Sequence, residues 1–233
     1  MKKNLIPLFV ILFVAFAALG VLAGNRLFPA ISPDSSTDSG LPSNSAQSNY
    51  LIVQSNAIEA ESSELVSAWI MFYHPSAPAH ITIVPVYPTE NLEVRDRLTR
   101  SFSITRNHKL ETRFVNLVER TYDLQVDGYI LLDETASRYF ARLVTQRELN
   151  LSGNSPTSPD AIQSVLNNGQ TIFSAFCVTL STIGLKTISE TVNWTEILPS
   201  HFTTDLSFEV LNLVVAQMES SGIIEDCTVF NNQ

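Results

Sequence analysis

The sequence predicts an α/β protein with a mixed central sheet covered by helices on both faces, preceded by one N-terminal transmembrane helix. Three features carry this prediction: a long uncharged segment near the N-terminus, apolar runs of strand length, and amphipathic segments of helical period between them. Strands that alternate with helices are typical of layered α/β folds. The chain beyond the apolar segment is long enough to bury one sizeable core, so we expect a single folded domain there.

The apolar segment at residues 5–24 is an uncharged stretch of 20 residues, LIPLFVILFVAFAALGVLAG. At about 1.5 Å rise per residue, this helix matches a hydrocarbon core of about 30 Å. Lys2 and Lys3 precede it and only Arg26 follows closely, so the N-terminus is expected in the cytoplasm. We therefore predict a single-pass protein of the cell membrane whose C-terminal domain lies outside the cytoplasm. A cleaved signal peptide is the alternative, although the run exceeds the usual apolar core of about 7–15 residues.

The composition divides the chain into three parts. Residues 1–26 are predicted to be a transmembrane signal-anchor, residues 27–49 a flexible Ser/Pro-rich tether, and residues 50–233 one extracytoplasmic domain. Most of the tether reads SPDSSTDSGLPSNSAQSN, which offers too little apolar surface to offset the entropy lost on ordering.

Two apolar runs, residues 65–72 and 81–87, flank a proline-containing turn and predict a β-hairpin. The first run shows little polar alternation, so we expect a strand that is buried on both faces. Strands of this kind belong inside a sheet that helices cover, which is the origin of the predicted α/β/α layers.

Local signals predict a helix, a strand and a second helix in the middle of the domain. Residues 111–122 place apolar side chains on one side of a helix, residues 126–132 are typical of a short strand, and Asp133 is placed to cap a helix at 134–143. Gly169 is a weak point in the helix that is predicted at 161–180. The later elements are a helix at 161–180 capped by Asp160, a helix at 206–218 capped by Thr204 or Asp205, and an edge strand at 227–230.

Charge is distributed unevenly within the total of −9. Between Arg95 and Arg147 there are ten basic and seven acidic residues (10 − 7 = +3), whereas residues 148–233 hold one basic and nine acidic residues (1 − 9 = −8). Either these regions complement each other across the fold, or some of the arginines line an anion site. Nucleic-acid binding is not expected of an acidic, exported chain.

The two cysteines, Cys177 and Cys227, both lie in the part predicted to be exported, where disulfides persist. A disulfide between them and a pair of buried thiols are both open alternatives, because a separation of 50 residues does not decide between them.

Three stretches share the order of parts of one known family: SAWIMFYHPSAPAHITIVPVYPTE at 67–90, YDLQVDGYILLD at 122–133, and ILPSHFTTDLSFEVLNLVVAQMES at 197–220. Together they resemble the extracytoplasmic domain of the LytR-CpsA-Psr (LCP) family, membrane-anchored bacterial enzymes that attach glycopolymers to the cell wall. The resemblance implies an LCP-like α/β/α fold and a polyprenyl pyrophosphate ligand. Its lipid would lie in an apolar cavity, and its pyrophosphate would be held by arginines and by a divalent metal on aspartates.

The family's catalytic motifs are not matched. Residues 85–90 read Pro-Val-Tyr-Pro-Thr-Glu where the family has Ser-Ile-Pro-Arg-Asp-Thr, and the region 156–172, where Arg-x-x-Arg-Gln is expected, contains no arginine. The resemblance therefore implies a catalytically impaired binder of polyprenyl (pyro)phosphate-linked glycopolymer, with no catalytic residue and no metal ligand assigned.

Two alternatives remain open. One is an active glycopolymer phosphotransferase, which would need Mg²⁺ and relocated arginines; the stretch 103–107, Ser-Ile-Thr-Arg-Asn, also resembles the lost motif. The other is a structural or interaction protein of the envelope without a ligand. The candidate phosphate-binding residues are Arg95, Arg97, Arg100, Arg106, Arg138 and Arg142.

Acidic residues gather near one predicted strand. Asp127, Asp133 and Glu134 could bind a metal or do acid–base work if they meet at one strand end, and otherwise they are a helix cap and solvated groups. The four histidines show neither the i, i+4 spacing nor the cysteine companions of a zinc site.

Overall fold

The computed structural model describes residues 47–230 apart from residues 61, 77, 152, 221–223 and 225. The predicted transmembrane segment at 5–24, and all of the predicted tether but its last three residues, lie outside the described residues. Among the residues that are described, no helix has the length and apolar character needed to cross a bilayer.

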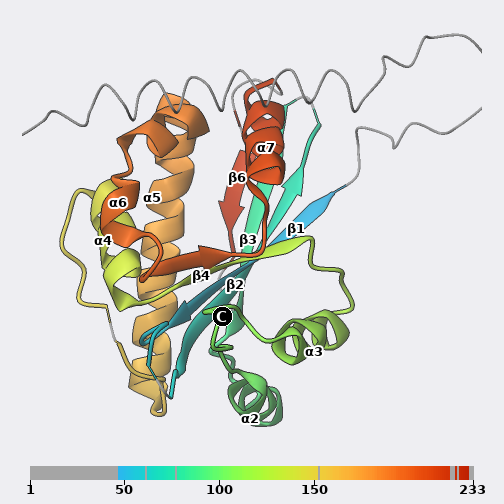
Figure 1. Cartoon of the computed structure of the whole chain (residues 1–233), viewed down its shortest axis with the longest axis vertical. Coiled ribbons are helices and arrows are strands. Elements are labelled where there is room, and N and C mark those ends of the chain that lie inside the picture. Colours follow the sequence, from blue (N-terminus) through green and yellow to red (C-terminus); the bar gives the residue numbers. More distant parts are fainter. Residues whose placement is uncertain are drawn as a thin grey trace, which may run out of the picture. The chain divides into compact units, whose positions relative to one another are not determined.

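A six-stranded mixed sheet forms the centre of the domain, in the order β5-β4-β1-β2-β3-β6 (Figure 1). β1 pairs in parallel with β4 and β3 in parallel with β6, while the other three pairings are antiparallel. The predicted mixed sheet is therefore confirmed. The strands are β1 (Ser48–Ser55), β2 (Leu65–His74), β3 (His80–Tyr87), β4 (Gly128–Leu132), β5 (Phe202–Thr204) and β6 (Asp226–Val229).

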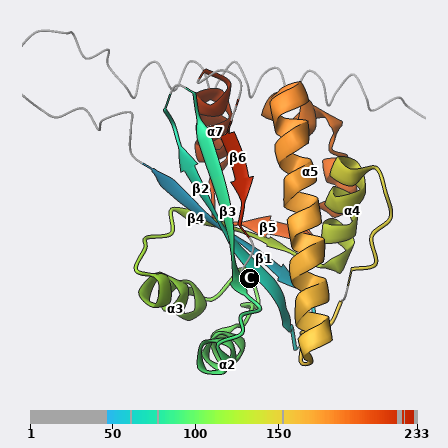
Figure 2. The same ribbon diagram turned by 180° about the vertical axis from the view of Figure 1, so that it is seen from behind.

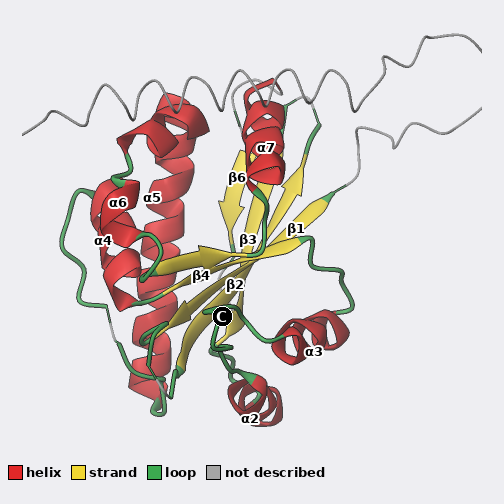
Figure 3. Cartoon of the chain, in the orientation of Figure 1, coloured by secondary structure: helices red, strands yellow, loops and turns green. Residues whose placement is uncertain are grey.

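Helices cover both faces of the sheet, as Figure 2 shows from behind. One face packs against α2 (Leu92–Ser101) and α3 (Thr112–Tyr122) through a core that includes Leu98, Phe114 and Val118. The other face packs against three longer elements and the short α6. These are α4 (Glu134–Thr145), α5 (Pro159–Thr191), α6 (Trp194–Ile197) and α7 (Phe208–Ser220), with Trp69, Leu166, Leu180 and Met218 in their core. The predicted α/β/α layers are confirmed. Figure 3 colours the helices red and the strands of the sheet yellow.

The middle of the domain follows its local signals closely. The hairpin of β2 and β3, helix α3, strand β4 and the edge strand β6 all form where they were predicted. Asp133 caps α4 as expected, because its side chain accepts a hydrogen bond from the backbone N–H of Ala136.

Helix α5 differs from its prediction at both ends. Its cap is Ser158, whose hydroxyl accepts from the N–H of Ala161, so the prediction of Asp160 as the cap was wrong. The helix continues past its predicted end and bends at Gly184, which has a φ of +76°. Gly169 is not simply a weak point, since a Cβ at this position would collide with the ring of Trp69.

The caps predicted for α7 were also wrong. Thr204 lies in β5, and Asp205 accepts a hydrogen bond from the N–H of Tyr129 at 2.7 Å instead of capping the helix. The hydroxyl of Ser207 lies 3.3 Å from the N–H of Val210 and takes the capping position. The edge of β4 needs hydrogen-bond partners for its backbone, and the residues before α7 supply them.

Cys177 and Cys227 form a disulfide, with Cα atoms 5.4 Å apart. The bond joins helix α5 to the edge strand β6 across 50 residues of chain. Of the two alternatives that the sequence left open for these cysteines, the disulfide is the correct one.

Candidate functional site

The most distinctive polar arrangement lies where β1, β3 and β4 end. These three strands run in the same direction, so their carboxyl ends meet at one edge of the sheet, which we call the carboxyl edge. β1 and β4 are neighbours there, but the chain leaves β1 toward β2 and leaves β4 toward α4. Open α/β sheets place their ligand sites at the carboxyl ends of strands, beside such a change of direction.

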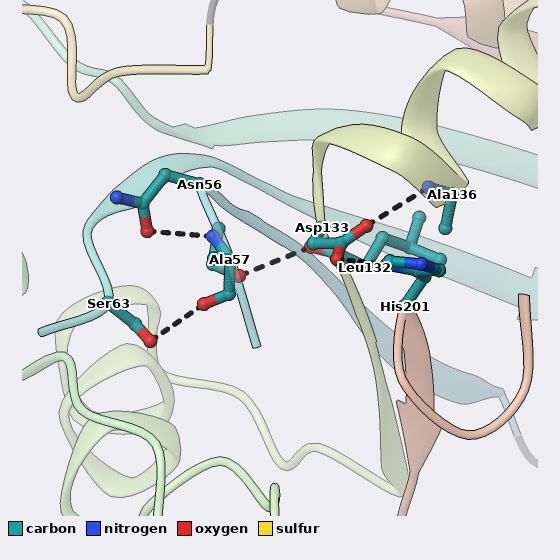
Figure 4. A network of polar contacts seen from close by, with 8 residues as sticks. Asn56, Ala57, Ser63, Leu132, Asp133, Ala136 and His201 are labelled. Atoms are coloured by element: carbon teal, nitrogen blue, oxygen red, sulfur yellow. Dashed lines mark hydrogen bonds and ion pairs between the residues drawn. The ribbon is translucent and has the colours of Figure 1, made fainter. Parts of the chain in front are cut away.

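Asp133 and His201 form a close pair at this edge (Figure 4). Asp133 directly follows β4, and its Oδ2 atom lies 2.6 Å from Nδ1 of His201. The Asp133 side chain is only 8% exposed, whereas that of His201 is 35% exposed. The backbone joins the two residues as well, since the N–H of Asp133 donates to the carbonyl of His201. The pair therefore ties the start of α4 to the chain segment that enters β5.

The turn that follows β1 is fixed beside this pair by its own side chains. The Asn56 side-chain oxygen accepts from the N–H groups of Ala57 and Glu64, both at 2.8 Å. The hydroxyl of Ser63 donates to the carbonyl of Ala57 at 2.7 Å, as Figure 4 shows. These side-chain hydrogen bonds hold the ends of the turn together at the carboxyl edge.

The chain between α4 and α5 crosses the carboxyl edge, and α4 holds its first part. Arg138 pairs with Glu134 at 2.6 Å and donates to the carbonyl of Leu151 at 3.3 Å. Gly153 packs directly against the carboxylate of Glu134, where a Cβ would collide with it. A larger residue at this point of the crossing would have to displace the Glu134 carboxylate from its position.

The second part of the crossing is held by strands and by α2. Ser155 donates its N–H to the Glu64 carboxylate at 3.2 Å, and its hydroxyl lies 3.0 Å from the hydroxyl of Tyr87. The hydroxyl of Thr99 on α2 donates to the same Tyr87 oxygen at 3.2 Å. We call residues 149–151 and 153–158 the crossing loop; they link α4, β3 and α2 over the carboxyl edge.

The Asp133–His201 pair has the chemistry of an oriented imidazole. A carboxylate that accepts from Nδ1–H fixes the tautomer and leaves Nε2 as an acceptor, the arrangement used by general bases and by metal-ligating histidines. Nε2 of His201 makes no hydrogen bond to a described residue. Within the described part of the chain, no group of three or more His, Cys, Asp or Glu residues is placed to hold a metal ion.

Comparison with family models and with curated proteins gives no match for this sequence. Solved structures do match. TagT bound to LIIa-WTA has a TM-score of 0.52 at 10% sequence identity and covers 83% of this chain and 82% of its own. TagV of B. subtilis has a TM-score of 0.51 at 11% identity and covers 80% of this chain and 85% of its own. The chain has an LCP-like fold.

In this LCP-like fold, the carboxyl edge includes the stretch whose sequence departs from the family motif. Residues 85–90 span the end of β3, and their side chains include no arginine and no aspartate. The Tyr87 hydroxyl is engaged by Ser155 and Thr99 instead. The departure seen in the sequence therefore falls at the same end of the sheet as the Asp133–His201 pair, with β1 and β2 between them.

The six candidate arginines are not gathered into one cluster. Arg95, Arg97 and Arg100 lie on α2, while Arg138 and Arg142 lie on α4, on the opposite face of the sheet. Their side chains are exposed, apart from that of Arg95, which is partly buried. Arg138 contacts the crossing loop, whereas Arg142 pairs with Glu148 at 3.5 Å.

Arg106 lies in the exposed loop between α2 and α3. The same loop borders an open hollow of about 480 Å³, which Thr105, Asn107, Lys109 and Arg113 help to line. The guanidinium of Arg113 is already committed, since it donates to the Ser103 hydroxyl at 3.1 Å and pairs with Glu111 at 3.2 Å.

Of the two alternatives for Asp127, Asp133 and Glu134, the structure has the helix cap, since Asp133 caps α4. Asp133 and Glu134 lie together at the carboxyl end of β4, but Asp127 precedes the strand and accepts from the N–H of Asn49 at 2.8 Å. Five strand residues separate Asp127 from the other two, so the three carboxylates do not meet. Sequence reasoning missed His201, whose partner lies 68 positions away.

Proposed function

We propose that this chain is a membrane-anchored, extracytoplasmic protein of the cell envelope that binds a polyprenyl (pyro)phosphate-linked glycopolymer without transferring it. The observation that carries this proposal is the likeness to TagT over 83% of this chain, since TagT was solved bound to LIIa-WTA. The anchor at residues 5–24 would keep the domain beside the bilayer, where a polyprenyl lipid resides.

The residues at the carboxyl edge argue against phosphoryl transfer. Transfer depends on positive charge that converges on the phosphoryl group, from arginines and Mg²⁺. Five of the six candidate arginines lie on α2 and α4, which occupy opposite faces of the sheet. Residues 85–90 add hydroxyl and apolar groups to the edge, together with the single carboxylate of Glu90.

The disulfide supports the proposed location outside the cytoplasm. Disulfides such as Cys177–Cys227 form and persist in oxidising compartments and are rare in the cytosol. This argument is independent of the apolar segment, and both lead to the same side of the membrane.

The full-length chain in lipid nanodiscs provides the test. It would be incubated with a polyprenyl-pyrophosphate-linked glycopolymer and Mg²⁺, with bound ligand followed by native mass spectrometry and lipid phosphate by release assay. We expect retained glycopolymer and no released lipid phosphate. Release would establish the active transferase instead, and absence of retained ligand would leave the ligand-free envelope protein.

Two matched variants sharpen the test. Arg138→Ala removes a guanidinium that contacts the crossing loop, and we expect about tenfold weaker retention of the glycopolymer. Arg120→Ala removes an exposed guanidinium of α3 that donates to no described residue except Asn116, at its carbonyl, and we expect unchanged retention. Equal effects of the two variants would exclude Arg138 as a phosphate-binding residue.

A further inference from the structure

The end of the sheet opposite the carboxyl edge carries a second polar region. β1, β3 and β6 begin there and β2 ends there, so we call it the open end. On the face of α2 and α3, Phe72 is the last side chain of β2 that still packs on the helix core. His74 lies two residues beyond it and is exposed.

Register places polar side chains of three strands in one row at the open end. His74 of β2 is directly opposite His80 of β3, which in turn is directly opposite Asp226 of β6. The next row on the same face contains Phe72 and Thr82, because residues two apart share a face. Side chains directly opposite one another have Cβ atoms about 4.5–5.5 Å apart, so these groups are close enough to contact one ligand.

These rows border an open hollow of about 450 Å³ at the surface. One side of it is the ring of Phe72, and the other groups can donate or accept hydrogen bonds. Nδ1 of His80 lies 3.2 Å from Asp226, which holds that ring in place and leaves Nε2 facing away from the carboxylate. The hollow is lined by Gln47, Phe72, His74, Ser76, His80 and Thr82.

We propose that this hollow binds a pyranose sugar of the glycopolymer, an inference that rests on the function proposed above. A pyranose ring has an apolar C–H face and a rim of hydroxyl groups. Phe72 offers the matching aromatic surface, while the imidazole, amide and hydroxyl groups around it match the rim. Among the described residues that line the hollow there is no lysine, arginine, aspartate or glutamate, which fits a neutral sugar better than a phosphate.

The position of the hollow also fits a polymer that is presented at a membrane. Gln47, which lines it, is the first described residue, so the predicted tether joins the domain at this point. The tether segment 27–46 can reach at most about 70 Å when extended. The hollow therefore lies where the described chain begins, whereas the carboxyl edge is at the other end of the sheet.

Saturation-transfer NMR on the full-length chain in nanodiscs tests the proposal, with the methyl glycosides of glucose, galactose and N-acetylglucosamine as probes. We expect transfer to the C–H protons of at least one glycoside. Phe72→Leu keeps the apolar volume but removes the ring, and it should reduce this transfer about tenfold. The double variant His74→Ala/His80→Ala should weaken binding about fivefold or more.

His108→Asn serves as the matched control, because His108 is an exposed histidine outside the hollow and asparagine tolerates its φ of 58°. Transfer that is absent for every glycoside, or equal in Phe72→Leu and His108→Asn, would overturn the proposal. A glycoside displaced by a peptide of residues 27–46 would show that the tether competes for the hollow, which supports a binding site there.

Native mass spectrometry of the same variants separates this inference from the proposed function. If the lipid-linked glycopolymer is retained equally by the wild type and by Phe72→Leu, the hollow is not the sugar site and the proposed function stands. If glycosides bind but the lipid-linked polymer is not retained, the sugar site stands and the proposed function fails.

Discussion

Two aspartate–histidine pairs occupy opposite ends of the same sheet. Asp133 and His201 are 2.6 Å apart at the carboxyl edge, with side chains 8% and 35% exposed. Asp226 and His80 are 3.2 Å apart at the open end, with side chains 61% and 45% exposed. The same two residue types therefore form a mostly buried pair at one end of the sheet and a solvated pair at the other.

The difference follows from what covers each end. The crossing loop and the first turn of α4 close over the carboxyl edge, so Asp133 must satisfy both carboxylate oxygens within the protein. Neither α2 nor α3 extends over the open end, and water can solvate Asp226 and His80 there. We expect loss of the first pair to cost stability and loss of the second to change binding.

Removing the disulfide should lower the free energy of unfolding more than any other change, because this bond holds β6, the strand that carries Asp226. Cys177→Ala/Cys227→Ala opens a loop of 50 residues, and chain entropy predicts a loss of about 4 kcal/mol in the free energy of unfolding. Urea unfolding of the variant, compared with wild type with and without reductant, measures it. A variant as stable as the oxidised wild type would show that β6 is held by its hydrogen bonds to β3 alone.

Asp133→Ala should come next, with a loss of about 2 kcal/mol. It removes the cap of α4 and leaves the Nδ1–H of His201 without its acceptor in a largely covered place. Asp133→Asn keeps a capping oxygen and should recover part of the loss. The urea midpoints of the two variants provide the measurement, and equal midpoints would mean that the histidine contact contributes nothing.

Ser137→Ala changes a buried side chain of α4 near the same edge, and it should raise the free energy of unfolding where Asp133→Ala lowers it. The Ser137 hydroxyl is buried without a hydrogen-bond partner in the described part of the chain, and alanine is a better helix former. We expect a gain of about 0.5–1 kcal/mol by urea unfolding. A loss of stability would mean that a water molecule satisfies this hydroxyl.

Asp226→Ala should change stability by less than about 0.5 kcal/mol, because both members of its pair are solvated. Thermal unfolding beside Asp133→Ala makes the contrast direct. A loss as large as that of Asp133→Ala would contradict the distinction between the two ends.

Alkaline pH should weaken the fold with no effect near neutrality. Burial raises the pKa of the phenols of Tyr50, Tyr122 and Tyr129 above the usual value of about 10. The unfolded chain therefore loses these protons first, so this stability is fully present below about pH 10 and declines as the pH rises further. Unfolding temperatures between pH 9 and 11 measure the decline, which should be shallower in Tyr50→Phe; an identical slope would exclude Tyr50.

Sequence signals predicted the elements whose patterns are local. The hairpin, α3 and the Asp133 cap of α4 all depend on residues within a few positions of each other. The sequence did not reveal α2, since Leu98 is the only buried side chain among its ten residues and the segment is typical of a polar loop. Strand β5 has three residues, too few for a period-two pattern to be visible.

The candidate site was harder to predict because its members come from distant parts of the chain. Asp133 was expected as a cap, but its contact with His201 depends on where β5 pairs with β4. The choice between a disulfide and two thiols likewise depended on a Cα separation of 5.4 Å, which no spacing along the sequence determines. The sequence indicated the local role of each residue, but it did not indicate which distant residue each one would contact.

The bond between Cys177 and Cys227 also makes one covalent ring of the chain that carries α6, β5, α7 and His201. A protease that cuts once inside this ring cannot release either fragment. The nicked protein would keep its mass apart from one added water, migrate as a single species without reductant, and separate into two pieces only after reduction. The segment between the two cysteines, which carries β5 and α7, is thereby retained after a single cleavage.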